Sequence, residues 1–217
     1  MYTDQKQIDE AYKRFDGFNI RFRNHEGEDP MQMLDLFNPD GTGCYHIRYV
    51  FDKRARTITI SGDLGWAVFC PTWDADFAET AKVVAVGRNF GYFMEKCRAT
   101  SDRYEYDMDR AKKEILEDFS NANVDDHAED EDEEDSDETI EDAVSAVMEE
   151  WGQHGEGFCG FNRTDNREAV RCLKKYLGGD YCESLYEYGK KWSGRVYLWL
   201  AGLDYAFRTM KAEGKVA

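Results

Sequence analysis

An unbroken acidic run near the middle of the chain limits what that part of the sequence can fold into. Residues 125–138 contain eleven Asp and Glu side chains in fourteen positions and no Lys or Arg. Such a stretch has no apolar face to bury and its like charges repel one another, so it cannot contribute to a hydrophobic core. We therefore expect residues 122–137 to be solvated and disordered in the free protein.

The charge of the whole chain, −17 over 217 residues, is concentrated around this run. Residues 102–150 contain 22 acids and four bases, whereas the remaining residues contain 23 acids and 24 bases. This distribution predicts a nearly neutral globular body that carries one strongly acidic segment. The phosphates of nucleic acid would be repelled by that segment, whereas a basic protein surface would be attracted to it.

The rest of the sequence is typical of a folded protein. Thirteen Phe, thirteen Tyr and five Trp residues are too many for a disordered chain. No apolar stretch is long enough to span a membrane, and the first residues lack the pattern of a signal peptide. The six Cys residues include no C-x-x-C pair and fit reduced thiols. We expect a location in the cytoplasm of a bacterial host cell.

Alternating apolar residues predict an antiparallel sheet over about residues 18–70. The clearest strand has one face that carries Tyr45, Ile47, Tyr49 and Phe51. His46 and Arg48 lie on its other face, and a return strand carries Ile58 and Ile60. Weaker strand patterns precede it at residues 18–23 and 31–37, and another follows at 66–69. Short turns between these segments predict a meander.

Helical spacing predicts helices on both sides of the acidic run. In the N-terminal part we expect helices at 4–15 and at 74–86, the second with Asp74 as its N-cap. Helices at 107–119 and 139–151 bracket the acidic run, and Thr139 with Asp142 predicts a capping box. A further helix follows Asp165. The last helix has an apolar stripe of Val196, Leu200, Leu203, Phe207 and Met210.

The predicted fold class is α+β, an antiparallel sheet packed against helices. We expect a sheet-containing part at 1–101 and an acidic helical segment at 102–150, with the disordered run at 122–137. A helical part at 151–217 should pack on the same core as the sheet.

Three stretches resemble a group of small uncharacterised proteins that bacteriophages and prophages encode. The residues that carry the resemblance are YHIRYVFD at 45–52, ITISGDLGWAVF at 58–69 and YEYGKKWSGRVYLWLAGLDYAF at 186–207. It covers about residues 44–98 and 186–210. The resemblance implies an accessory protein of a mobile element, and many such proteins antagonise host defences.

Two metal sites can be drawn from the sequence, and neither is favoured. Residues 130–141 place oxygen-bearing side chains at EF-hand spacing, but Asp135 stands where the loop requires Gly. Cys44 with His46, and His154 with Cys159, are possible zinc ligands, but no C-x-x-C pair completes a site. We therefore predict no metal and no cofactor.

No enzyme signature is present either. Residues 157–161 resemble a nucleophile elbow around Cys159, but Phe161 replaces the last Gly and no strand precedes it. Residues 165–190 can be aligned with a helix-turn-helix, yet the charge of the chain argues against direct nucleic acid binding. Asp63, in a Gly-flanked turn, is expected to hold backbone amides. We predict no catalytic residue.

The leading hypothesis is a non-enzymatic, phage-type inhibitor that binds a basic nucleic-acid-handling host protein. A nuclease or CRISPR effector would be its target, and the acidic run would mimic DNA in an anti-CRISPR or anti-restriction role. The alternative is an anti-defence protein that binds or sequesters a nucleotide, with a pocket near Tyr45, Trp66, Trp192 and Trp199. The sequence does not predict an oligomeric state. The expected partner-binding residues are Asp125, Asp126, Glu129, Asp130, Glu131, Asp132, Glu133, Glu134, Asp135, Asp137 and Glu138.

Overall fold

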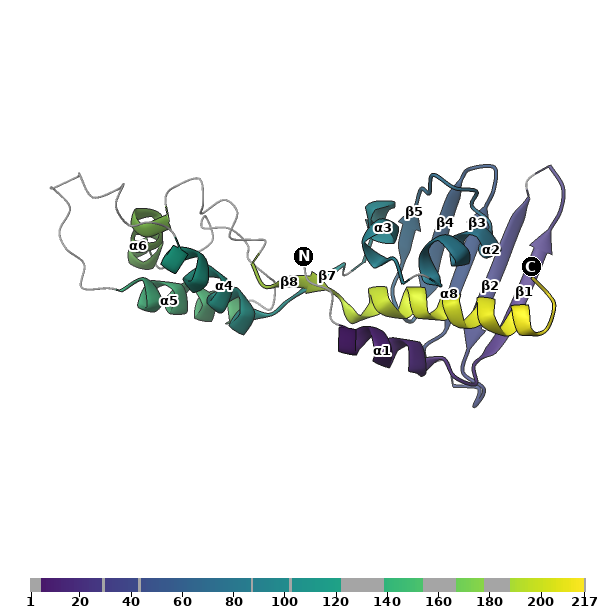
Figure 1. Ribbon diagram of the computed structural model, residues 1–217, viewed down its shortest axis with the longest axis horizontal. Helices are drawn as coiled ribbons and strands as arrows, with labels where there is room; N and C mark the ends of the chain where they lie inside the picture. Colours follow the sequence, from purple (N-terminus) through teal and green to yellow (C-terminus); the bar gives the residue numbers. More distant parts are fainter. Residues whose placement is uncertain are drawn as a thin grey trace. The chain divides into compact units, whose positions relative to one another are not determined.

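The chain forms two compact units (Figure 1). The sheet unit comprises Thr3–Arg103 and Trp192–Ala217, and the helical unit comprises Met1–Tyr2 and Tyr104–Lys191. This computed structural model describes residues 5–28, 30–42, 44–86, 88–101, 103–121, 139–153, 167–177 and 188–216.

The sheet unit is built on six antiparallel strands whose order in the sheet is their order in the chain. The strands are β1 (Asn19–His25), β2 (Met31–Phe37), β3 (Ile47–Asp52), β4 (Thr57–Gly62), β5 (Ala67–Phe69) and β6 (Cys97–Thr100). The α+β class that the sequence predicts is therefore confirmed, and the first five strands lie where the alternation predicts them. No pattern in the sequence singled out β6, which pairs with β5 after three intervening helical elements.

Burial alternates along the central strands, as a sheet with one covered face requires. In β3, Ile47, Tyr49 and Phe51 are fully buried, whereas Arg48 and Val50 on the opposite face are partly exposed. Ile58 and Ile60 repeat the pattern in β4. Tyr45 does not belong to this face, because it lies before β3 in a turn with a φ of 61°. The expectation that the strand begins before Ile47 is therefore wrong.

Helices cover one face of this sheet (Figure 1). They are α1 (Gln5–Arg14), α2 (Phe77–Thr80), the π-helix η1 (Ala81–Ala85), α3 (Phe90–Glu95) and α8 (Gly194–Ala212). The predicted stripe of α8 is confirmed, since all five of its residues are buried. Tyr49 Oη donates a hydrogen bond to the Trp199 carbonyl at 2.6 Å. A Cβ at Gly202 would lie 2.6 Å from Tyr49 Oη, so α8 approaches the sheet too closely for a side chain there.

The helix expected at 74–86 begins later than its predicted cap. Asp76, not Asp74, is the N-cap, and its side chain accepts hydrogen bonds from the backbone N–H groups of Ala78 and Glu79. Asp76 is held in this position because Lys53 Nζ lies 2.6 Å from its carboxylate and Gln32 donates a hydrogen bond at 3.0 Å. These long-range contacts decide between two Asp residues that look alike in the sequence.

The helical unit packs three helices, α4 (Met108–Asn121), α5 (Ile140–Gln153) and α6 (Arg167–Leu177). A short two-stranded sheet, β7 (Tyr104–Tyr106) with β8 (Lys190–Trp192), was not expected. The predicted capping box of α5 is confirmed, because Thr139 Oγ1 accepts from the Asp142 N–H at 3.2 Å and donates to its carboxylate at 2.7 Å. The buried core of this unit comprises Ala111, Ile115, Ile140, Ala143, Val144, Val147, Met148, Ala169, Cys172 and Leu173.

The stretch at 151–217 is divided between the two units. Helix α6 packs against α5, whereas α8 packs against α1 and η1. The run at 122–137, predicted to be disordered, lies outside the described residues. Among the helices that the structure does describe, none is both long and apolar enough to cross a membrane.

Candidate functional site

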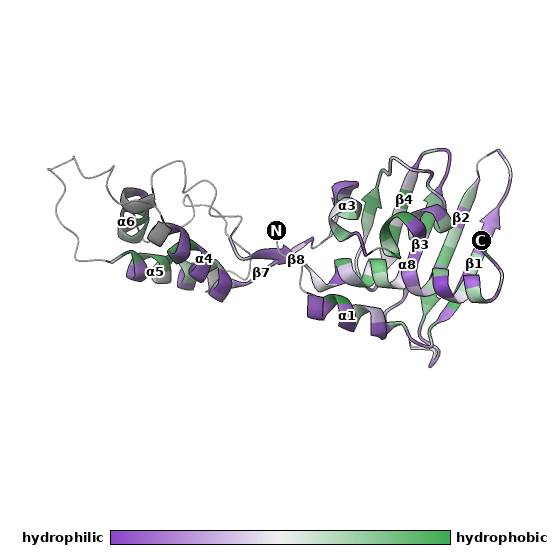
Figure 2. Cartoon of the chain, viewed as in Figure 1, coloured by the Kyte–Doolittle hydropathy of each residue, from purple (hydrophilic) through white to green (hydrophobic). Residues whose placement is uncertain are grey.

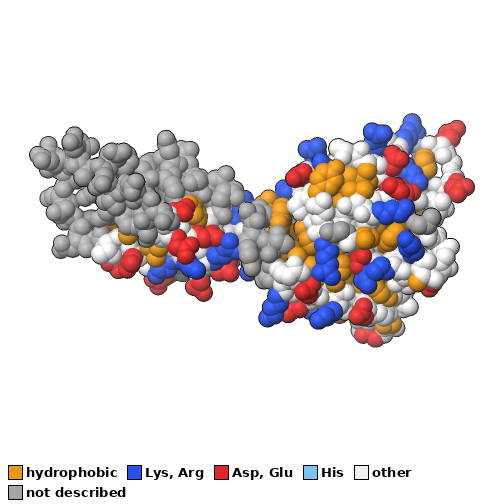
Figure 3. Space-filling view, in the orientation of Figure 1, with side chains coloured by type: hydrophobic (Ala, Val, Ile, Leu, Met, Phe, Trp, Pro, Cys, Tyr) orange, Lys and Arg blue, Asp and Glu red, His pale blue; other side chains and the backbone are white. Residues whose placement is uncertain are grey.

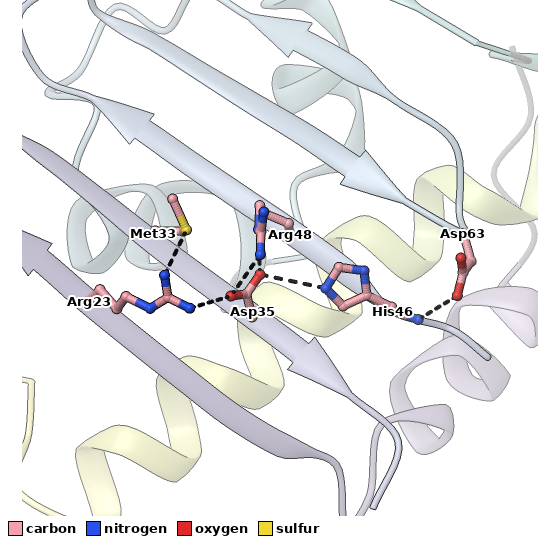
Figure 4. A network of polar contacts seen from close by, with 6 residues as sticks. All are labelled: Arg23, Met33, Asp35, His46, Arg48 and Asp63. Atoms are coloured by element: carbon pink, nitrogen blue, oxygen red, sulfur yellow. Dashed lines mark hydrogen bonds and ion pairs between the residues drawn. The ribbon is translucent and has the colours of Figure 1, made fainter. Parts of the chain in front are cut away.

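The sheet face opposite the helices carries a cluster of charged side chains around one carboxylate (Figure 4). Asp35 lies in the middle of β2, and the strand register places Arg48 of β3 and Arg21 of β1 on either side of it. The remaining members are Arg23 of β1 and His46, which immediately precedes β3. We call these five residues the Asp35 cluster.

Asp35 is only 3% exposed although it faces away from the helices, because arginine and histidine side chains surround its carboxylate. Arg48 makes a bidentate contact, with Nε 2.6 Å from Oδ1 and Nη2 3.3 Å from Oδ2. Arg23 Nη2 lies 3.7 Å from Oδ2, and His46 Nε2 lies 3.6 Å from Oδ1. Figure 4 shows the side chains of Arg23, Arg48 and His46 converging on the one carboxylate.

The electrostatics of the cluster keep Asp35 ionised. Burial by itself raises the pKa of this carboxyl group. The hydrogen bond from Arg48 and the charges of Arg48, His46 and Arg23 outweigh burial, so the pKa of Asp35 lies below its usual value. Asp35 in turn raises the pKa of Arg48. A carboxylate stabilised in this way is a poor proton acceptor at neutral pH, so the arrangement favours binding over acid–base chemistry.

The cluster has more positive than negative charge. Arg21, Arg23 and Arg48 are opposed by Asp35 alone, which leaves two positive charges even with a neutral His46. The Arg21 guanidinium also lies over the Phe37 ring, 5.4 Å from its centroid. Arg23 and Arg48 remain about 40% exposed, at 43% and 40% respectively. The sheet face can therefore attract an acidic group.

The turn before β3 fixes His46 by its backbone. Asp63 accepts a hydrogen bond from the His46 N–H at 3.0 Å, which confirms the expectation that Asp63 holds a backbone amide. Tyr45, next to it, lies under the Arg14 guanidinium at 5.2 Å from the ring centroid. Cys44 is exposed in the same turn. Cys44 and His46, considered above as zinc ligands, therefore lie before β3 and do not share a face of that strand.

The other candidate ligands and the predicted partner-binding residues lie elsewhere. His154, Cys159 and all eleven acidic residues named between 125 and 138 lie outside the described residues. Within the described ranges, no group of three His, Cys, Asp or Glu side chains is arranged to hold a metal ion.

The aromatic residues named for a ligand pocket have different environments. Trp199 is fully buried and donates its indole N–H to the Leu64 carbonyl at 3.0 Å. Trp192 is also buried, under the Arg103 guanidinium, whereas Trp66 is 49% exposed. The indoles of Trp192 and Trp199 thus serve as core residues of the sheet unit.

The charges of the chain separate by unit. The helical unit contains 27 acidic and 10 basic residues, whereas the sheet unit contains 18 of each. The whole excess of negative charge therefore belongs to the helical unit. On the face of the sheet unit seen in Figure 3, Lys and Arg side chains are interspersed with Asp and Glu side chains.

Comparison with protein-family models, with curated proteins and with solved structures found no match for this chain.

The alternation in the sequence placed His46 and Arg48 on the same face of a predicted strand, but it did not single out Asp35 or Arg23. One signal was present. Asp35 is the only charged residue in the apolar stretch MQMLDLF, and a lone charge in a strand requires a partner on a neighbouring strand. The identity of that partner depends on the β1–β2–β3 register, which the sequence does not specify.

Proposed function

We propose that this protein is a non-enzymatic binding protein whose helical unit binds a basic, nucleic-acid-handling partner. The observation that supports this proposal is the separation of charge, because the excess of seventeen acidic residues falls in one unit and the other is neutral. A segregated negative field steers a cationic protein surface toward one part of the molecule and accelerates association.

The specific form of the proposal is a phage-type inhibitor that occupies the DNA-binding groove of a nuclease or CRISPR effector. Eleven carboxylates in fourteen residues approach the charge density of a single nucleic acid strand. The resemblance of residues 44–98 and 186–210 to phage and prophage proteins supports the choice of target.

The proposal is tested by competition with DNA. A purified CRISPR effector nuclease is loaded with a fluorescent target duplex, and the protein is titrated in while duplex release is followed by anisotropy. We expect release at low salt and weaker release as salt rises, because screening acts over about 8 Å at physiological ionic strength. Stable retention of the duplex across a panel of nucleases and restriction enzymes would contradict the proposal.

A matched pair of variants identifies the unit responsible. One variant carries Glu129→Gln, Glu131→Gln and Glu133→Gln in the helical unit, and the other carries Glu26→Gln, Glu28→Gln and Glu95→Gln in the sheet unit. Both remove three negative charges by the same substitution. We expect only the first to release less duplex and to show a flatter salt dependence. Equal effects would mean that total charge, and not the helical unit, determines binding.

A further inference from the structure

Strand β1 forms one edge of the sheet and has an unpaired side. It lies at the end of the strand order and pairs only with β2. In an antiparallel pair, every second residue turns its N–H and C=O groups away from the partner strand. Within the described ranges, no backbone hydrogen bond from another element reaches the outward groups of Asn19–His25. The edge is therefore available for pairing with another strand.

A groove of about 620 Å³ runs along this edge, between β1 and the C-terminal end of α8. Figure 1 shows this end of α8 beside β1. Phe18, Ile20 and Phe22 are half-buried on the strand side of the groove, and Met210 and Lys215 lie on the helix side. An apolar side chain that enters the groove would bury area against the exposed parts of these three strand-side residues.

The helix side of the groove is well fixed. Helix α8 ends in a Schellman motif, in which Lys215 N–H donates to the Met210 carbonyl at 2.8 Å and Gly214 N–H donates to the Lys211 carbonyl at 3.0 Å. Gly214 has the positive φ, 70°, that this motif requires. Tyr205 Oη donates to the Phe18 carbonyl at 2.9 Å and ties the start of β1 to the helix. The groove is thus formed before any ligand binds.

The charges on β1 determine which strand fits. Arg21 and Arg23 are exposed on its outer face, and Figure 2 shows β1 as largely hydrophilic. A second copy of β1 paired about Phe22 would place Arg21 opposite Arg23. A shift by two residues would place one of these arginines opposite its own copy. Like charges directly opposite one another are destabilising, so self-pairing is disfavoured.

We propose that the β1 edge and its groove bind an extended segment of a partner protein in which acidic and apolar residues alternate. The segment adds a seventh strand to the sheet. Its acidic side chains pair with Arg21 and Arg23 on the open face, and its apolar side chains enter the groove beside Phe22. This surface does not involve the acidic helical unit. The segment that it binds is acidic, whereas the partner proposed for the helical unit is basic.

The test uses fluorescent eight-residue peptides and the full-length protein. The probe alternates Glu with Val, one control replaces each Glu by Lys, and the other replaces each Val by Ser. We expect saturable binding of the Glu–Val peptide alone, with protection of β1 amides from hydrogen exchange. No saturable binding, equal binding of the Lys–Val peptide, or protection outside β1 would overturn the proposal.

A charge exchange separates strand addition from general attraction. Arg21→Glu with Arg23→Glu should weaken Glu–Val binding by about tenfold or more, since two attractive cross-strand pairs become repulsive. The same variant should gain affinity for the Lys–Val peptide. Arg21→Lys with Arg23→Lys should keep Glu–Val binding because the positive charges are retained, and the gained affinity of the first variant for the Lys–Val peptide would show that it is still folded. Arg98→Glu on β6, the other edge of the sheet, is the matched control and should change nothing. An equal loss with Arg98→Glu would overturn the assignment to β1.

Discussion

The sheet unit and the helical unit each bury an apolar core, but they build it from different elements and different side chains. The sheet unit buries alternating strand residues beneath α8, including Tyr49, Phe51 and Trp199. The helical unit buries one stripe from each of three shorter helices, with smaller residues such as Val144 and Val147. Both cores are apolar, yet the net charges of the two units differ by seventeen. A hydrophobic core thus does not determine the charge of the surface around it. The surface of each unit can therefore match a different partner.

The largest expected effect tests whether the two cores are independent. Leu200 of α8 and Leu173 of α6 are buried to a similar extent, at 0% and 2% exposure. Leu200→Ala and Leu173→Ala should each cost about 2–5 kcal/mol through lost burial and a cavity. Hydrogen exchange should show each loss confined to its own unit. A loss of protection in both units from either substitution would mean that they unfold together.

A smaller effect is expected at Asp35 of the sheet unit. Asp35→Asn should lower the free energy of unfolding by about 1–3 kcal/mol at pH 7, because buried charge-assisted hydrogen bonds are lost. The folded-state pKa of Asp35 is lowered, so its contribution is present above the unfolded pKa of about 3.9 and disappears as the pH falls through the folded pKa. Denaturation from pH 7 to pH 2 should show wild type and variant converging.

Asp204 is the control for this pH dependence. Burial raises its pKa, against the opposing effects of Arg208 and Arg88. Its charged form therefore costs stability as the pH rises above the unfolded pKa. Asp204→Asn should become more stable relative to wild type between pH 3 and pH 7, opposite in sign to Asp35→Asn. The same trend in both variants would contradict the assigned pKa directions.

Helix caps provide the third comparison. Thr139→Ala removes the capping box of α5 and should cost the helical unit about 1 kcal/mol. Asp76→Ala removes a cap in the sheet unit that also pairs with Lys53 and Gln32, so it should cost more. Chemical denaturation followed by circular dichroism measures both. Equal costs would show that the contacts with Lys53 and Gln32 add nothing to the cap.

The smallest effect is expected from the acidic run. Exchanging Glu129, Asp130, Glu131, Asp132, Glu133, Glu134 and Asp135 for their amides removes seven negative charges without changing side-chain size. The melting temperature should stay nearly the same or rise, because the run has no apolar area and its like charges repel. A substantial decrease would show that these carboxylates make stabilising contacts in the folded protein.

The features predictable from the sequence were those that depend on local pattern. Alternation located β3 and β4 because one face of each strand is buried, and the spacing of Thr139 and Asp142 located the start of α5 because a capping box is formed within one turn. The α8 stripe was predictable for the same reason.

The features that escaped prediction depend on residues far apart in the chain. The choice of Asp76 over Asp74 depends on Lys53 and Gln32, which reach it from other elements. The Asp35 cluster and the free edge of β1 both depend on strand order and register, which alternation leaves open. The sequence showed that acidic residues outnumber basic residues in one part of the chain. Only the fold showed that this excess of negative charge falls within one compact unit.

The position of α8 after the helical unit has a consequence for synthesis on the ribosome. Strands β1 to β6 emerge first, but Trp199 and Leu200, which cover them, emerge only after the whole helical unit has been made. Until then the apolar face of the nascent sheet lacks the part of its cover that α8 provides. The helical unit, whose residues apart from Met1–Tyr2 run without a break from Tyr104 to Lys191, can acquire its fold during this interval. Its high negative charge would keep the unfinished chain in solution while the exposed face awaits α8.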